Sequence, residues 1–186
     1  MKRSLILGGA RSGKSAYAER LASESGKDVV YIATASAGDS EMSARIEHHR
    51  KQRPAHWTTV EEGLSLAAAL HTWRTPQRLV LVDCLTLWLS NLLFSDCTGY
   101  PDVGAITLPE RFHTERAALL SEVARADAGA IIFVSNEVGM GIVPYGAVSR
   151  AFTDEAGRLN QAVAAACDHV AFVAAGLPLT LKGASC

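Results

Sequence analysis

Residues 5–15 read Leu5-Ile6-Leu7-Gly8-Gly9-Ala10-Arg11-Ser12-Gly13-Lys14-Ser15, an apolar run followed by a glycine-rich stretch. From Gly8 to Ser15 the chain matches the pattern G-x-x-x-x-G-K-[ST], and a helix-like segment follows at 15–24. In this context glycines let backbone N–H groups turn inward around a phosphate, and the helix directs its positive end at the same anion. A chance glycine-rich turn is the alternative, and the flanking strand and helix patterns argue against it. The stretch therefore predicts a nucleoside triphosphate site.

Two side chains of this loop have predicted roles, and a carboxylate elsewhere completes the site. Lys14 is expected to reach the outer phosphates, and the Ser15 hydroxyl to ligate Mg²⁺. The run 79–83 (LVLVD) reads as a buried strand that ends in Asp83. An isolated Asp at a strand end is more often a helix N-cap or a turn residue. Beside a phosphate loop, however, such an acid completes the magnesium site, directly or through water.

Short runs rich in Val, Ile and Leu alternate with segments of helical periodicity along the chain. Buried strands are expected at 4–7, 29–33, 79–82, 130–134 and 169–173, with further short strands at 56–60 and 178–181. Helices are expected at 14–25, 41–52, 63–73, 85–94, 109–125 and 148–166. This alternation is typical of a mostly parallel sheet with helices on both faces, and the last run suits an antiparallel edge strand. We therefore predict an α/β fold in a single P-loop nucleotide-binding catalytic domain, residues 1–186.

The composition narrows the class of protein. The net charge of −1 gives no electrostatic reason to expect nucleic acid or an anionic membrane as a partner. No apolar stretch approaches the roughly 18 residues of a membrane span, and the apolar run after Met1-Lys2-Arg3 is too short for a signal peptide. The 4 cysteines form no C-x-x-C pair, which disfavours zinc and disulfide frameworks. We therefore expect reduced thiols and a cytoplasmic location.

A basic, histidine-containing stretch ends the predicted helix 41–52. Met42, Ile46 and His49 are spaced i, i+4 and i+7, so they share one helix face. A solvated helix end whose cations favour the helix dipole is the plain alternative. A metal site on the histidine pair is disfavoured, because adjacent helical residues point about 100° apart. Near a triphosphate site, neutral imidazole can attack an α-phosphate while Arg and Lys stabilise the departing pyrophosphate, which makes His49 the candidate nucleophile.

The stretch 135–144 (SNEVGMGIVP) begins where the strand 130–134 is expected to end. Ligands of open α/β sheets bind at this carboxyl edge. A structural turn explains its two glycines equally well, and the roles of Asn136 and Glu137 as substrate-orienting groups stay open.

Together these stretches resemble the bifunctional adenosylcobinamide kinase / adenosylcobinamide-phosphate guanylyltransferase family of cobalamin biosynthesis. The resemblance is carried by GGARSGKS (8–15), YIAT (31–34), EMSARIEHH (41–49), RPAHW (53–57) and SNEVGMGIVP (135–144), with Ala156-Gly157-Arg158 and Asn160-Gln161 as further matches. It extends from the first strand to Lys182 and so covers nearly the whole chain. It implies a RecA-like P-loop fold and a homo-oligomer, usually a trimer.

The resemblance also implies a two-step activity with Mg²⁺. Adenosylcobinamide is phosphorylated with ATP or GTP; then GTP guanylylates a histidine, here His49, and the GMP passes to adenosylcobinamide phosphate to give adenosylcobinamide-GDP. Nucleotide contacts are implied at Gly8, Gly9, Ala10, Arg11, Ser12, Gly13, Lys14, Ser15, Ala33, Thr34, Ala35, Arg50, Lys51, Gln52, Arg53, Glu61 and Asp83. Some relatives have Glu where this chain has Asp83, which leaves open whether this carboxylate contacts the metal or the guanosine.

Two other functions fit parts of the pattern. A plain P-loop small-molecule kinase would use the phosphate loop alone, with His49 only structural. A nucleotide-dependent switch protein would bind GTP and a partner protein, but the chain lacks the guanine-specificity motif N-K-x-D. Covalent labelling of the protein by GTP separates the bifunctional enzyme from both.

Overall fold

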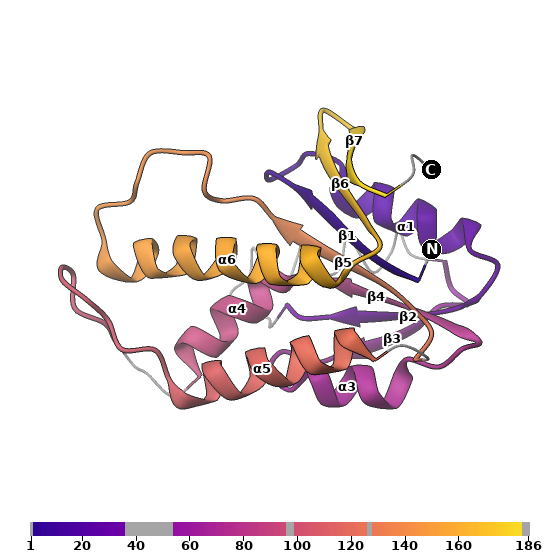
Figure 1. Cartoon of the computed structure of the whole chain (residues 1–186), viewed down its shortest axis with the longest axis horizontal. Coiled ribbons are helices and arrows are strands. Elements are labelled where there is room, and N and C mark those ends of the chain that lie inside the picture. The colour runs from indigo at the N-terminus through magenta and orange to yellow at the C-terminus, as the bar shows by residue number, and fades with distance from the viewer. Residues whose placement is uncertain (1, 36–53, 96–98, 126–127, 184–186) are drawn as a thin grey trace.

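The computed structural model describes residues 2–35, 54–95, 99–125 and 128–183 (Figure 1). The strands are β1 (Arg3–Gly8), β2 (Asp28–Ala33), β3 (Thr58–Glu61), β4 (Arg78–Asp83), β5 (Ala130–Asn136), β6 (His169–Ala174) and β7 (Leu177–Lys182). The helices are α1 (Lys14–Glu24), α3 (Leu66–Trp73), α4 (Leu85–Phe94), α5 (Glu110–Ala124) and α6 (Ala147–Ala166). Among these helices, none is long and apolar enough to cross a membrane.

Within the described residues the strands form one 7-stranded sheet in the order β3-β2-β4-β5-β1-β6-β7. The pairs from β3 to β6 are parallel, and β7 is antiparallel to β6 at the edge. The predicted parallel sheet with an antiparallel edge strand is therefore confirmed. Because the strands run in the same direction, their carboxyl ends meet at one edge of the sheet, towards the left in Figure 1.

Helices cover both faces of this sheet, which explains the continuous apolar runs of its strands. Tyr17 and Ala18 of α1 pack with Ile6 and Ile132 on one face. On the other face, α3, α4, α5 and α6 pack on the alternate strand residues, with Trp88 of α4 fully buried in that cluster. Successive side chains of each strand point to opposite faces of the sheet, so the core has two layers. The layer under α1 is separate from the layer under α3, α4, α5 and α6.

The helix predicted at 63–73 is wrong at its start, since α3 begins only at Leu66. The carboxylate of Glu62 accepts hydrogen bonds from the backbone N–H groups of Leu64 and Ser65, both at 2.8 Å. These bonds close a turn just before the helix, which apolar periodicity does not reveal. The predicted helix 41–52 lies outside the described residues.

Candidate functional site: a nucleotide site at the carboxyl edge of the sheet

The strand register places three of the predicted site residues in one row. Ala33, at the end of β2, is the Cα partner of Glu61 at the end of β3 and of Asp83 at the end of β4. At the other side of β5, Gly8 ends β1 and leads into the phosphate loop; it is the partner of Asn136. The fold therefore gathers residues far apart in sequence along the edge where open α/β sheets bind ligands.

The phosphate loop is held from two sides by backbone hydrogen bonds. The N–H of Gly176, in the turn between β6 and β7, donates to the carbonyl of Ser12 at 2.8 Å. The N–H of Glu137, which follows β5, donates to the carbonyl of Gly8 at 3.1 Å. Gly13 adopts φ 93° and forms the N-cap of α1, and the N–H of Lys14, the first residue of the helix, donates to the hydroxyl of Ser12 at 3.4 Å, so the loop leads directly into the positive end of the helix. This is the arrangement that binds a phosphate anion.

Lys14 lies across this loop. Its ammonium group donates to the carbonyl of Gly9 at 3.3 Å, and the residue is only 9% exposed. The Lys14 charge also acts on Cys84, where it opposes the effect of burial on the thiol. The buried lysine is therefore held within the loop by its contact with Gly9.

Asp83 is held by a residue that the sequence did not single out. The hydroxyl of Tyr31, on β2, donates to Oδ2 of Asp83 at 2.9 Å. Tyr31 is 2% exposed, while Asp83 is half-buried. The carboxylate is therefore oriented from the neighbouring strand, and a single Tyr within YIAT carries no recognisable signal of this role.

A chain of polar contacts continues from β2 to α6. The Thr34 hydroxyl donates to the carbonyl of Cys84 at 2.7 Å and accepts from the N–H of Cys84 at 2.8 Å. The Asn136 amide donates to the hydroxyl of Thr86 at 2.8 Å, and the Asn160 amide donates to the carbonyl of Asn136 at 3.2 Å. Thr86 was not singled out in the sequence, and Asn160 was named there only as a match to the family, without a role. These contacts bind the ends of β2, β4 and β5 to α4 and α6.

Cys84 does not provide a nucleophile at neutral pH. Burial raises the pKa of its thiol to about 11, with the neighbouring Asp83 carboxylate adding to the shift. The protonated thiol therefore acts as a small packing group under the site.

The described part of the predicted site covers the loop residues 8–15, the segment 33–35, Glu61 and Asp83. The candidate nucleophile His49 and the basic segment 50–53 lie outside the described residues.

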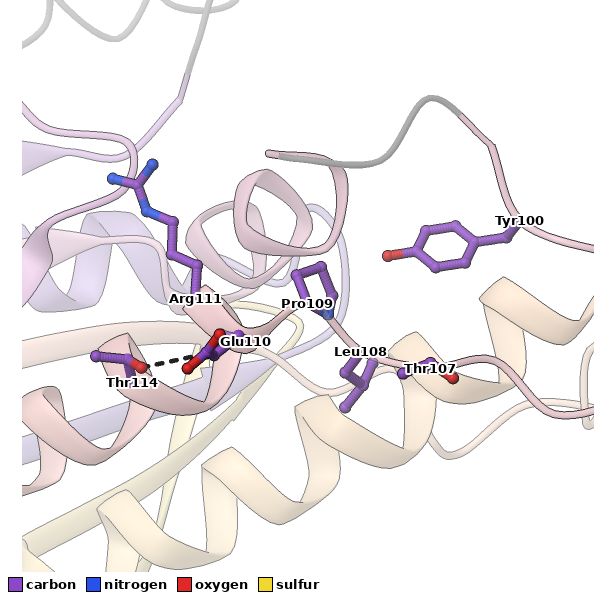
Figure 2. Close-up of a pocket in the computed structure, with 7 residues that line it drawn as sticks. All are labelled: Tyr100, Thr107, Leu108, Pro109, Glu110, Arg111 and Thr114. Atoms are coloured by element: carbon purple, nitrogen blue, oxygen red, sulfur yellow. Dashed lines mark hydrogen bonds between the residues drawn. The ribbon is translucent and has the colours of Figure 1, made fainter.

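A hollow of about 600 Å³ lies apart from these residues, at the start of α5 (Figure 2). Tyr100, Leu108, Pro109 and Arg111 are among its lining residues. Figure 2 shows the Tyr100 hydroxyl directed towards Pro109, and this hydroxyl donates to the carbonyl of Leu93. Of the predicted nucleotide residues that the structure describes, none lines this hollow.

The comparison with known families decides the assignment. A family model described as cobinamide kinase / cobinamide phosphate guanyltransferase matches residues 4–181. The chain belongs to this family. The bifunctional adenosylcobalamin biosynthesis protein CobP of Pseudomonas aeruginosa is 56% identical over 97% of this chain and 98% of its own length. The protein CobU of Escherichia coli, with the same bifunctional description, is 43% identical over 96% of this chain and 98% of its own length. The predicted membership of the cobinamide kinase / guanyltransferase family is thus confirmed.

Solved structures confirm the P-loop fold. An ATPase of the type III secretion system of pathogenic bacteria superposes with a TM-score of 0.59 at 13% identity over 96% of this chain. The type III secretion ATPase EscN of enteropathogenic E. coli superposes with a TM-score of 0.57 at 13% identity over 94% of this chain. This chain covers 56% of the first ATPase chain and 43% of the second. At 13% identity the likeness concerns the shared fold alone.

Replacing Tyr31 with Phe is expected to weaken Mg²⁺-dependent nucleotide binding by about 10-fold or more, because a hydrogen bond to a charged group is lost. Without its Tyr31 partner, the Asp83 carboxylate is no longer held in one orientation. Calorimetric titration of GTP with and without Mg²⁺ measures this effect. Equal loss of affinity in both titrations would show that Tyr31 supports the site only by packing.

Replacing Gly13 with Ala is expected to weaken nucleotide binding by about 10-fold or more, because left-handed backbone is costly for Ala. The added Cβ would also lie 3.0 Å from Cα of Gly176, against backbone that cannot move freely. Gly26→Ala is the matched control, since Gly26 has φ 66° at the other end of α1 and its Cβ would meet no atom within 4 Å. Both variants should lose stability in thermal unfolding, and only Gly13→Ala should lose GTP affinity.

Proposed function

We propose that this chain is a bifunctional enzyme of cobalamin biosynthesis that phosphorylates adenosylcobinamide and then attaches GMP to the product. The observation that carries the proposal is the phosphate loop at the start of α1, facing the same sheet edge as Asp83, in a chain of the cobinamide kinase / guanyltransferase family. The proposal assigns both reactions to one catalytic domain, residues 1–186.

In the first reaction, the substrate hydroxyl oxygen attacks the γ-phosphorus of ATP or GTP. The bond to the bridging oxygen breaks, the nucleoside diphosphate leaves, and the hydroxyl proton passes to a base or to solvent. The first-turn N–H groups of α1 and the Lys14 ammonium hold the phosphates and stabilise the charge that develops on them.

In the second reaction, an imidazole nitrogen of His49 attacks the α-phosphorus of GTP, and pyrophosphate leaves. A phosphate oxygen of adenosylcobinamide phosphate then attacks the same phosphorus. The P–N bond breaks, adenosylcobinamide-GDP forms, and the imidazole is restored. Histidine has a reference pKa near 6.5, which leaves enough neutral imidazole for attack at cytoplasmic pH.

Ser15 and Asp83 fit a magnesium ion, because both offer the hard oxygen donors that Mg²⁺ prefers. Ser15 lies in the first turn of α1, and the Asp83 carboxylate is oriented by Tyr31 at the carboxyl edge. When bound, Mg²⁺ neutralises charge on the phosphate oxygens and polarises the phosphoryl group.

Incubation with GTP labelled at either phosphorus tests the proposal. Label in the α-phosphate should remain on the denatured protein, whereas label in the γ-phosphate should not. The protein-bound label should be released by acid and resist alkali, which distinguishes a P–N bond from a phosphate ester. A protein that phosphorylates adenosylcobinamide but takes up no α-label would be a kinase alone.

We also propose a cytoplasmic homotrimer that uses the metabolite pools of ATP and GTP. The edge strand β7 supports self-association, because Leu177, Leu179 and Leu181 are between 57% and 73% exposed. Light scattering on the purified protein should give about three times the chain mass of 19.8 kDa. A mass of a single chain would contradict the trimer without affecting the assignment of the reactions.

A further inference from the structure

We propose that a groove between residues 138–144 and α6, here called the α6 groove, binds the corrin ring of adenosylcobinamide. This inference rests on the proposed function and names the part of the chain that holds its acceptor. The groove has a volume of about 540 Å³, within the usual range of ligand sites. Val138, Ile142 and Val143 line one wall, and Gly157, Arg158 and Gln161 of α6 line the other.

The groove lies next to the phosphate loop through direct backbone contact. Glu137, the residue before the groove wall, donates its N–H to the carbonyl of Gly8 at 3.1 Å. The Asn160 amide of α6 donates to the carbonyl of Asn136 at 3.2 Å. A ligand in the groove therefore lies beside the strand ends that carry the nucleotide site. Kinase chemistry requires this proximity, because the acceptor hydroxyl must reach the γ-phosphate.

The groove wall is also fastened at its far end. Arg150 of α6 donates to the carbonyl of Pro144 at 3.2 Å and to the carbonyl of Tyr145. In Figure 1 the connection from β5 to α6 extends well beyond the sheet and returns to the start of α6. Contacts at both ends fix where this connection leaves the sheet and where it rejoins the helix, which limits the ordering needed on binding.

The chemistry of the groove matches a corrinoid. A corrin ring presents a broad apolar surface with a fringe of amide side chains. Ile142 is 97% exposed, Met140 is 78% exposed and Val143 is 75% exposed, which is an unusual concentration of free apolar surface. The opposite wall offers Thr153, Asp154 and Gln161, which can exchange hydrogen bonds with amides. One edge of the ring would enter the groove and its face would cover the exposed side chains.

Gly157 leaves open the space that such a ligand needs. A Cβ added at Gly157 would meet no atom within 4 Å, although the residue lies in the middle of α6. Glycine is a poor helix former, so its place in this helix has no local structural reason. The hollow in Figure 2 fits less well, because none of the described residues that line it has a hydrogen bond to the phosphate loop like that of Glu137.

Gly157→Leu tests the assignment by filling the groove without changing a charge. Equilibrium dialysis of adenosylcobinamide, followed by the visible absorbance of the corrin, should show affinity reduced by about 10-fold or more, the loss expected when a pocket is blocked. GTP binding and protein labelling by α-labelled GTP should remain at the wild-type level. Ala165→Leu is the matched control, because Ala165 is an exposed position of α6 outside the groove.

A second variant removes apolar contact surface from the groove wall instead of filling the groove. Ile142→Ser should also weaken adenosylcobinamide binding, and it should not disturb folding because the side chain is almost fully exposed. Unchanged corrinoid affinity in both variants would overturn the proposed role of the groove. Covalent labelling of the wild type by α-labelled GTP would in that case still support the bifunctional enzyme. A change of oligomeric mass in Gly157→Leu, with unchanged corrinoid affinity per chain, would instead identify the groove as a contact between copies. Wild-type protein without covalent label and without corrinoid binding would overturn both proposals.

Discussion

Replacing His49 with alanine is expected to abolish the covalent guanylate on the protein and to stop formation of adenosylcobinamide-GDP. In the proposed mechanism this side chain supplies the nitrogen that forms the P–N bond, and alanine has no nucleophile to replace it. Loss of a covalent nucleophile typically costs several orders of magnitude in rate, on the order of 10³ or more. Protein labelling by α-labelled GTP measures the first effect, and chromatography of the corrinoid products measures the second.

His48→Ala is the matched control, because it removes the neighbouring imidazole from the same sequence. It should retain most of the protein label. The His49→Ala variant should still phosphorylate adenosylcobinamide, since the proposed γ-phosphate transfer uses the phosphate loop and no histidine nucleophile. Equal labelling of His49→Ala and the wild type would assign the nucleophile to another residue.

Replacing Lys14 with alanine is expected to reduce both reactions by at least about 100-fold, the usual cost of removing a charge-stabilising donor. The Lys14 ammonium donates to the carbonyl of Gly9, in the loop that we propose holds the phosphates in each half-reaction. The effect should therefore appear in the kinase rate and in the protein label together. Initial rates of corrinoid phosphorylation and of labelling by GTP provide the two measurements.

Lys27→Ala controls for the loss of a positive charge. Lys27 lies just before β2, at the amino edge of the sheet, and its ammonium donates to the carbonyl of Pro76 at 2.6 Å. This variant should keep both activities, and circular dichroism should show the same fold for both lysine variants. Full kinase turnover in Lys14→Ala would remove this lysine from the phosphate site.

The sequence was sufficient to predict the fold because its apolar strand runs, its helical periodicity and its phosphate loop all indicate the same α/β fold. Strands buried on both faces are continuously apolar, so their order along the chain can be read without tertiary information. The phosphate loop is equally local, since eight consecutive residues bend the backbone and begin α1. The start of α3 was misplaced because Glu62 forms its turn through hydrogen bonds that no hydrophobic period reports.

By itself, then, this sequence determined the P-loop fold, the candidate cradle around Lys14 and the family. Only the tertiary structure decided which groups orient the site. The Tyr31 hydroxyl meets Asp83 because β2 and β4 are neighbours in register, although 52 positions separate the two residues. One end of the α6 groove likewise depends on packing, because the Asn160 amide meets the carbonyl of Asn136, 24 positions earlier, whereas the contact of Arg150 with Pro144 is local. Such contacts depend on which strands are neighbours in the sheet and on how the helices pack over them. Both are decided when the whole core is buried, and no short stretch of sequence determines them.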